Sequence, residues 1–396
     1  MTIEPSKLKA QGEEFVNTQF PELFQLLEKI VLINSHCTNI SGVNAVQDII
    51  ATELRNCGMQ IEFFEKDNQP KALIARSPAC AGNNIVLSLH ADTVYFPKSK
   101  FNWFKDEGDR FVGPGVFDLK GAIVTMLGVI RALKNLNLLE KLPICVLITP
   151  DEESDSVVGE AVIDSIKDEI NCAIVMELAR ENDNILIDRY GIGYYDISVT
   201  GRADHSGNGF DKGANAFVQL CHTVTRIFAL SDVNKYTFNL TNPNSGEQLN
   251  VIPDFASCRS DLRLSSISYL PEIDQKIKEI EEDIIIPGTR VSIKRSKLTH
   301  PVEATTESLI LLDSLLKSAH EAGFSSTRSA TSRGASDENI FASHGITTAD
   351  GLGPSGGKAH IENEEWVDKS SFVPKVLTLV YWFIDRLENP IQFKRS

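Results

Sequence analysis

Three short, almost unbroken apolar runs in the first half of the chain have the length of buried strands. They are NIVLSL (84–89), PICVLIT (143–149) and CAIVMEL (172–178). Residues 119–139, between the first two runs, place apolar side chains at helical spacing and contain no proline. Strands buried on both faces read as continuous apolar runs, and their alternation with helices is typical of a parallel sheet covered by helices. The pattern therefore predicts an α/β domain.

A different pattern begins near Tyr190, where apolar and polar residues alternate as in a half-exposed strand. The segment that follows has helical spacing, and Asp211 is its expected N-cap. A strand, a helix, two strands, a helix and a last strand then succeed one another, as in a small α+β sandwich. These expected elements cover residues 191–201, 211–230, 235–241, 249–264, 271–284 and 290–296.

The α/β pattern returns after residue 302, so the small domain is predicted to be inserted into the larger one. Two expected helices precede the first buried strand, at 11–34 and 43–57. After the insertion we expect a helix at 306–322, a strand at 346–350 and a helix at 366–387. The predicted boundaries are 1–189 for the first part of the larger domain, 190–302 for the insertion and 303–396 for the second part.

Charge and cysteine usage exclude several classes of protein. The 396-residue chain has a formal net charge of −15, and its lysines and arginines form no stripe. We therefore expect neither nucleic acid nor an anionic membrane as a partner. Seven scattered cysteines without CxxC spacing favour free thiols in a reducing compartment. With no apolar run of roughly 18 residues and no signal-peptide core, we expect a cytoplasmic protein, or a mature form whose leader was removed.

Histidines and carboxylates follow the predicted strands at the points where those strands end. Ligands of an open α/β sheet bind beyond the carboxyl ends of its strands, so these side chains are expected to share one edge. They are His90 and Asp92 after the first strand, Asp118 at a helix entrance, Glu152 and Glu153 after the second strand, Glu177 in the third, and His360 after residues 346–350.

Each of these residues also has a simpler interpretation. A histidine after a strand is usually a surface residue, an aspartate before a helix is usually an N-cap, and an acidic run in a loop is usually solvated. Their coincidence at one edge favours a metal site, because unpaired carboxylates so close together would repel one another. Two histidines and several carboxylates suit zinc or a related ion, and their number fits two metals that share one carboxylate.

A second candidate site lies in the glycines of GLGPSGG (351–357), which satisfy the G-x-G-x-x-G pattern of dinucleotide-binding loops. A proline interrupts these glycines and no helix follows promptly, so a dinucleotide enzyme is disfavoured.

Seven motifs occur in the following order: SLHADTVYF, GPGVFDLKGA, TPDEESDS, MELAR, GRADHSG, LNVIPDFASCRSDLR and GKAHIENEEWV. In order and rough spacing they resemble the M20 family of metallopeptidases and deacylases, most closely its glutamate carboxypeptidase branch. The resemblance implies a zinc-exopeptidase-like catalytic domain, with a mixed, largely parallel sheet flanked by helices. It also implies that the inserted α+β sandwich is a lid and dimerisation domain.

The resemblance assigns a role to each residue of the predicted edge. Glu152 would be the general base, and Asp92 would fix the orientation of a metal-binding histidine. A cis peptide bond is implied between Asp118 and Leu119. The implied metal ligands are His90 and Glu177 for one ion, Glu153 and His360 for the other, and Asp118 between the two. The implied cofactor is a pair of divalent ions, with Zn²⁺ favoured and Co²⁺ or Mn²⁺ as alternatives.

The inserted domain has implied roles as well. His205, in GRADHSG, matches a histidine that reaches the active site of the neighbouring subunit and stabilises the oxyanion, which implies a homodimer. Asn250 and Arg263 match positions that recognise a substrate carboxylate. Without the motif, Arg263 would be read as an exposed charge on a strand. Arg333 and Asp155 depart from the family pattern, so both are candidates for changing the substrate preference.

The function expected from the resemblance is the hydrolysis of an amide bond by two metals. The substrate would be a small peptide or an N-acyl amino acid that loses a C-terminal acidic residue. An alternative in the same fold is a deacylase of N-acetyl or N-succinyl amino acids, similar to acetylornithine deacetylase and succinyl-diaminopimelate desuccinylase. An alternative of another class is a binding protein with a decayed site, which the complete ligand set argues against.

Overall fold

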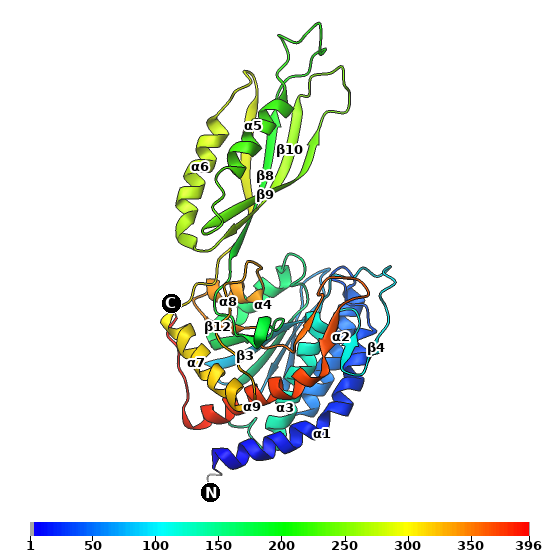
Figure 1. Ribbon diagram of the computed structural model, residues 1–396, viewed down its shortest axis with the longest axis vertical. Helices are drawn as coiled ribbons and strands as arrows, with labels where there is room; N and C mark the ends of the chain where they lie inside the picture. The colour runs from blue at the N-terminus through cyan, green and yellow to red at the C-terminus, as the bar shows by residue number, and fades with distance from the viewer. Residues whose placement is uncertain (1–3, 396) are drawn as a thin grey trace. The chain divides into compact units, whose positions relative to one another are not determined.

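The computed structural model describes residues 4–395, and these form two compact units (Figure 1). The larger unit contains the chain up to Ile187, residues 304–330 and the chain from Ser336 onward. The inserted unit contains Asp188–Glu303 and the short segment Thr331–Ala335. Within the described residues, no helix is both long enough and apolar enough to cross a membrane.

A six-stranded sheet forms the centre of the larger unit. Its strands, in spatial order, are β1 (Gln60–Phe64), β2 (Ala72–Arg76), β6 (Ile144–Thr149), β3 (Asn84–His90), β7 (Ile170–Val175) and β12 (Thr347–Asp350). The four strands from β6 to β12 pair in parallel, and β2 runs against both of its neighbours. The expected mixed, largely parallel sheet is therefore confirmed.

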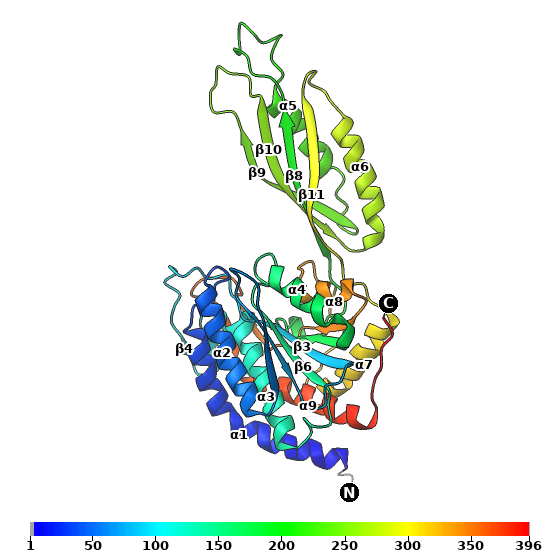
Figure 2. The same cartoon turned by 180° about the vertical axis from the view of Figure 1, so that it is seen from behind.

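Helices cover both faces of this sheet (Figures 1 and 2). The helices on one face are α1 (Pro5–Val31), α2 (Ile40–Asn56), α3 (Gly121–Asn135), α7 (Thr306–Glu321) and α9 (Phe372–Glu388). The other face is covered by α4 (Val157–Ile166) and α8 (Asp337–Ser343). Alternate strand residues face the two layers: in β3, Leu87 packs on the first side and Val86 on the second. Every residue of β3, β6 and β7 is buried, which explains their continuous apolar sequences.

A second, smaller sheet in the larger unit carries one of the candidate histidines. Its strands are β13 (Gly356–Gly357), β14 (Trp366–Asp368), β5 (Arg110–Val112) and β4 (Lys105–Asp106), in that spatial order. The loop between β13 and β14 contains His360. Because residues 366–368 form β14, the last helix begins at Phe372 rather than at the expected residue 366.

The inserted unit is an antiparallel sheet with two helices packed on one face (Figure 2). The strands, in spatial order, are β11 (Arg290–Thr299), β8 (Gly191–Thr200), β10 (Phe255–Leu264) and β9 (Tyr236–Ser245). Residues of β8 are alternately buried and exposed or half-buried, as a sheet with one covered face requires. The helices are α5 (Ala216–Phe228) and α6 (Leu270–Glu282). The N-cap of α5 is Asn215, whose side chain accepts a hydrogen bond from Val218 N–H, so the expectation for Asp211 was wrong.

Candidate metal centre

The carboxyl ends of three neighbouring strands bring most of the candidate residues together. His90 is the last residue of β3, Glu177 lies two residues beyond the end of β7, and Glu152 and Glu153 follow the end of β6. Since β6, β3 and β7 are adjacent and parallel, their ends open on the same edge of the sheet. This is the position at which open α/β sheets bind their ligands.

Asp118 reaches this edge from a distorted helical turn (Val116–Lys120) that precedes α3. The peptide bond between Asp118 and Leu119 is cis, as the resemblance implied. Asp118 is buried, and its backbone conformation is extended rather than helical, with φ −118° and ψ 88°. The carboxylate is therefore carried by a loop, not by a regular helical turn.

Glu365, which sequence reasoning missed, holds the Asp118 loop in place through hydrogen bonds. Its buried carboxylate accepts hydrogen bonds from the N–H groups of Phe117 (2.8 Å), Asp118 (2.9 Å) and Gly115 (3.1 Å). The hydroxyl of Tyr95 also donates to it, at 2.5 Å. In the sequence, Glu365 ends the run ENEE, which reads as solvated surface charge. Only the tertiary structure reveals that it satisfies the buried donors of the Asp118 loop.

His360 reaches the site from the loop between β13 and β14. Its backbone has φ +65°, in the left-handed region that residues other than glycine rarely adopt. Such strained positions cluster at functional sites, where the surrounding structure enforces them. The side chain remains about half exposed, at 51%. His360 is therefore the most accessible of the candidate ligands whose ion pairs are described.

Asp118 lies between the two histidines, with one oxygen facing each. Its Oδ1 is 3.1 Å from Nε2 of His90, and its Oδ2 is 3.1 Å from Nε2 of His360. Glu177 Oε1 lies 3.7 Å from the same nitrogen of His90. Glu153 Oε1 lies 2.9 Å from the same nitrogen of His360. Three clusters of possible metal ligands occur among the described residues: Asp118 belongs to two of them, and the third brings His90 together with Glu152 and Glu153.

The two histidines of these clusters retain protons strongly in the metal-free protein. Burial lowers the pKa of His90, but hydrogen bonds to Asp118 and Asp92 outweigh it and hold that pKa well above its usual value. Hydrogen bonds to Asp118 and Glu153 raise the pKa of His360 to about 10. Burial favours the neutral form of Asp118, yet the hydrogen bonds from His360 and His90 keep its pKa well below the usual range.

The neighbouring glutamates are affected in the opposite direction. Burial and the negative charge of Glu177 raise the pKa of Glu152 well above its usual value. Burial also raises the pKa of Glu153, despite its hydrogen bond to His360. The carboxylates thus repel one another and share the protons of two histidines. Divalent cations at the two clusters that contain Asp118 would replace those protons and relieve the repulsion, so the residues present fit a pair of metal ions.

Asp92 connects the histidine side of the site to the glutamate side. This fully buried carboxylate accepts hydrogen bonds from the backbone N–H of Glu152 (3.2 Å) and of Glu153 (3.0 Å). Nδ1 of His90, the ring nitrogen that faces away from Asp118, lies 3.1 Å from the main-chain carbonyl of Asp92 and 3.4 Å from its Oδ1. A carboxylate in this position orients the imidazole ring of a metal-binding histidine.

In the inserted unit, the structure places two of the three predicted residues side by side. His205 forms an isolated β-bridge with Val251, and Ser206 N–H donates to the carbonyl of Asn250 at 3.0 Å. Nδ1 of His205 accepts hydrogen bonds from the N–H groups of Gly207 and Asn208, both at 3.1 Å. In the neutral ring the proton is therefore on Nε2, which makes Nε2 a donor.

Arg263 lies at the other end of the same sheet. In the pairing of β10 with β8, Arg263 stands opposite Ile192, whereas Phe255, next to the His205 and Asn250 segments, stands opposite Thr200. Arg263 is eight residue steps along the strand from Phe255, which is roughly 26 Å at about 3.3 Å per residue. Within one chain, the inserted unit therefore does not bring Arg263 to His205 and Asn250.

The guanidinium of Arg263 already has partners. Nε and Nη2 donate to the Asp261 carboxylate at 2.9 and 2.8 Å, and Nη1 donates to the carbonyl of Arg333 at 3.2 Å. Two of its five N–H groups remain for a further acceptor. Arg333 itself donates to the carbonyl of Val233 at 2.7 Å and stacks over the ring of Tyr190.

Comparison with known proteins identifies relatives of this arrangement. Residues 86–384 match Peptidase family M20/M25/M40. Carboxypeptidase G2 of Pseudomonas sp. (strain RS-16) is 26% identical over 366 residues, which is 90% of this chain and 87% of that protein. An uncharacterized metallohydrolase of Methanocaldococcus jannaschii is 27% identical over 276 residues, 65% of this chain and 71% of that one. Among solved structures, aminopeptidase PepT from Bacillus cereus aligns with a TM-score of 0.76 at 18% identity, covering 92% of this chain and 97% of that chain.

Proposed function

The chain belongs to Peptidase family M20/M25/M40, and from this premise we propose that it is a two-metal carboxypeptidase that releases a C-terminal acidic residue. Membership and the peptidase relatives establish a metal-dependent hydrolase of amide bonds. The proposed substrate is a small peptide or an N-acyl amino acid that ends in glutamate or a similar residue. The similarity to carboxypeptidase G2 across 90% of the chain supports this choice of substrate.

The observation that supports two ions is the position of Asp118 between the histidines. In the proposal, Asp118 would be a ligand of both ions, and each ion would have one histidine and one glutamate of its own. The two sets are His90 with Glu177 and Glu153 with His360. Nitrogen and carboxylate donors without a thiolate favour Zn²⁺, with Co²⁺ and Mn²⁺ as alternatives. When bound, such a pair would supply Lewis-acid polarisation of the scissile carbonyl and would lower the pKa of the attacking water.

Glu152 is the proposed general base. It follows Asp151 in the turn after β6, and the N–H bond to Asp92 holds its backbone at the site. Its carboxylate would take a proton from the attacking water as the new C–O bond forms. It would then deliver that proton to the leaving nitrogen as the C–N bond breaks. Asp92 is the proposed positioning residue, because it contacts both the His90 ring and the Glu152 backbone.

His205, Asn250 and Arg263 are the proposed substrate-recognition residues. The Nε2–H of His205 would donate to the developing oxyanion. Asn250 and the two remaining N–H groups of Arg263 would bind the substrate carboxylates. The separation of roughly 26 Å along β10 means that one inserted unit cannot present Asn250 and Arg263 to the same small substrate. This separation supports a homodimer in which the two subunits contribute different residues to each active site.

Hydrolysis of matched substrates tests the proposal. Zinc-loaded protein is assayed with N-benzoyl-glutamate, N-benzoyl-glutamine and N-benzoyl-leucine, and beside them with N-acetylornithine and N-succinyl-diaminopimelate. We expect kcat/KM to be highest for the glutamate compound, by at least about tenfold over its uncharged glutamine analogue. The protein groups that bind the side-chain carboxylate would be left without an ionic partner by the neutral amide. A preference for N-acetylornithine or the succinyl compound would replace the carboxypeptidase assignment with a deacylase. Absence of hydrolysis of all five compounds would contradict the proposed substrate class.

A further inference from the structure

A cavity of about 570 Å³ lies at the amino ends of the central strands, at the opposite edge of the sheet from the metal centre. Asn83 and Ile85 line it at the start of β3, Pro143 precedes β6, and Asn171 and Cys172 lie at the start of β7. β3 is seven residues long, so this edge is about 20 Å from His90. The volume falls within the range of small-molecule sites, about 300–1,000 Å³.

The walls of the cavity are predominantly apolar. Leu138 and Leu142 come from the loop between α3 and β6, and Trp382 and Ile384 come from α9. These four side chains are buried, so the apolar surface that a ligand can reach comes mainly from the half-buried Pro143, Leu387 and Ile391. Leu8 of α1 closes another side. A ligand that fits these walls must present a hydrocarbon surface over most of its length.

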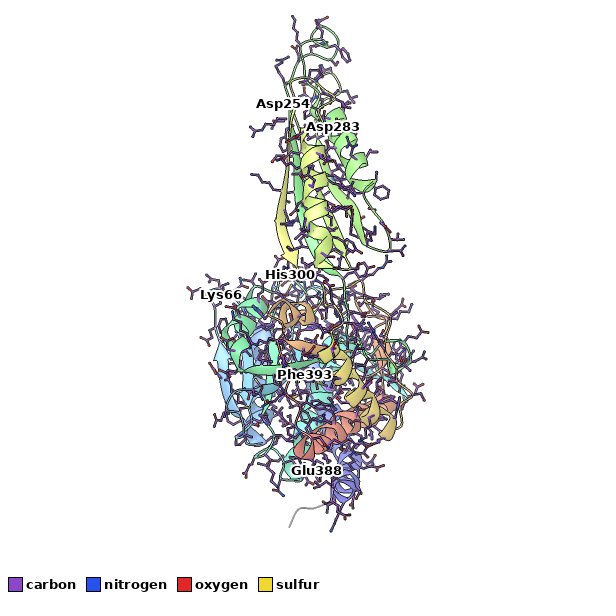
Figure 3. The ribbon with its side chains drawn as sticks, turned by 90° about the vertical axis from the view of Figure 1, so that its left-hand side faces the viewer. Lys66, Asp254, Asp283, His300, Glu388 and Phe393 are labelled. Atoms are coloured by element: carbon purple, nitrogen blue, oxygen red, sulfur yellow. The ribbon has the colours of Figure 1, made fainter. Side chains whose placement is uncertain are left out.

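The chain after α9 forms the remaining wall and is fixed there by Asn171. The Asn171 side chain donates to the carbonyl of Ile391 at 2.8 Å and accepts from Phe393 N–H at 2.9 Å. Phe393 packs against the main hydrophobic core. Figure 3 labels Glu388, the last residue of α9, and Phe393, the two ends of this segment. The segment is therefore a built wall of the cavity.

One cation of the cavity has no anionic partner in the part of the chain that the structure describes. Arg386 lines the cavity, and its guanidinium lies over the Trp382 ring at 5.4 Å. Its Nε is shielded from solvent and has no hydrogen-bond partner among the described residues. The adjacent Asp385 pairs instead with Lys9 and Lys317. Because Nε is shielded, a ligand would meet the half-buried guanidinium through its two Nη groups, and a carboxylate matches their planar arrangement best.

The other charged groups at the cavity lie on its rim. Lys141 and Glu388 both line the cavity and are both exposed. With Arg386, the charged residues that line the cavity are two cations and one anion, a surplus of one positive charge. This local surplus stands in a chain whose formal net charge is −15. The local field therefore favours an anion, although the protein as a whole repels one.

We propose that this cavity binds a small amphipathic carboxylate, with the carboxylate on Arg386 and a hydrocarbon tail against the half-buried Pro143, Leu387 and Ile391. The site is separate from the metal centre, and its occupant is distinct from the substrate of hydrolysis. The ligand would bridge α9, the starts of the central strands and the segment after α9. It would therefore stabilise the folded chain whether or not metal is present.

Binding of sodium octanoate tests this proposal, with octan-1-ol and octylammonium as probes of equal tail length. Calorimetric titrations are carried out on full-length zinc-loaded and chelator-treated protein, because a carboxylate can also bind to metal. We expect octanoate to bind one site per chain in both forms and to raise the unfolding temperature. Octanol and octylammonium should bind at least about tenfold more weakly, since neither can pair with the guanidinium.

Three variants test whether Arg386 and this cavity are responsible for octanoate binding. Arg386→Gln should weaken octanoate binding by about tenfold or more. Arg110→Gln is the matched control: Arg110 also stacks on a tryptophan, Trp366, but Glu107 already pairs with it, so octanoate binding should be unchanged. Ile391→Trp should fill the cavity and abolish binding, with far-UV circular dichroism as the check on folding.

Several outcomes would overturn the proposal. They are equal affinity for octanol and octanoate, unchanged binding in Arg386→Gln, unchanged binding in folded Ile391→Trp, and no saturable binding of octanoate at millimolar concentrations. Binding that disappears on chelation would also overturn it, because the carboxylate would then be on the metals. None of these results depends on which substrate the enzyme hydrolyses, so the fate of the proposed activity is a separate question.

Discussion

Replacing Asp92 by asparagine should damage metal binding more than folding. Asp92 accepts hydrogen bonds from two backbone N–H groups, those of Glu152 and Glu153, and lies beside Nδ1 of His90. Asparagine keeps the shape but has one carbonyl oxygen, so its amide group must face one of these donors. One buried N–H loses its acceptor, which costs about 1–3 kcal/mol of the free energy of unfolding.

The larger effect is expected on the metal ligands. Once the N–H of Glu152 or Glu153 loses its fixed acceptor, the turn that carries Glu153 is no longer held in place before metal binds, although the main-chain carbonyl of residue 92 still contacts the His90 ring. Loss of such a supporting carboxylate typically weakens metal affinity by about 10- to 100-fold. Affinity is measured by competition with a chromophoric chelator, and stability by thermal unfolding of the metal-free protein.

Asp151→Asn is a matched control for this prediction. Asp151 is also a buried carboxylate that accepts from two backbone N–H groups, those of Val158 (2.7 Å) and Gly159 (2.9 Å). These donors belong to the start of α4 and not to a candidate ligand. We expect Asp151→Asn to lose similar stability but to keep its metal affinity. If Asp92→Asn binds zinc as tightly as the wild type, or if both variants lose affinity equally, the positioning role of Asp92 is refuted.

Three further predictions concern the same centre. Glu152→Gln should retain its metal, as measured by elemental analysis, but its kcat should fall by about 10²–10⁴-fold. Glu153→Gln should instead lose metal affinity first. Normal metal content and normal activity in both variants would contradict the assignments. Hydrogen bonds hold the pKa of His360 at about 10, so a metal ion must displace the proton of this histidine. The apparent affinity for the metal should therefore rise about tenfold per pH unit between about pH 6 and pH 8, and titration calorimetry should detect proton release. A metal affinity that does not depend on pH would rule this out. His205→Ala should lower kcat without changing the metal content. Mixing this variant with Glu152→Gln should restore part of the activity, because a heterodimer contains one site with both residues. If subunit exchange is demonstrated and no activity returns, an active site shared between subunits is excluded.

The parts of the fold that sequence predicted are those with long, uniform patterns. β3, β6 and β7 are buried at every position, so their apolar runs were unambiguous. β1 was missed because its five residues mix exposed and half-buried positions. The strands of the small sheet were missed because two or three residues are too few to establish a period. Such elements depend on the pairing partner, which a local pattern does not contain.

The same distinction holds for the candidate site. His90, Asp118 and Glu177 follow or enter regular elements, so counting from the predicted strands and helices was enough to find them. Glu365 could not be found this way, because its importance comes from donors that lie about 250 positions away in the sequence. Asp211 was a plausible cap by residue type, but α5 begins five residues later, at Ala216, and Asn215 caps it. N-cap preference indicates which residue types can cap a helix, but tertiary packing determines the residue at which the helix begins.

The sharing of Asp118 between two clusters has a consequence for electroneutrality. Asp118, Glu152, Glu153 and Glu177, when ionised, carry four negative charges, and two divalent ions carry four positive charges. Two bound ions therefore balance these four carboxylates, whereas a centre with one ion keeps a surplus of two negative charges and an empty centre a surplus of four. The first ion meets the stronger attraction, so the second ion is bound less tightly than the first. Partly depleted protein should accordingly consist largely of chains that hold a single ion.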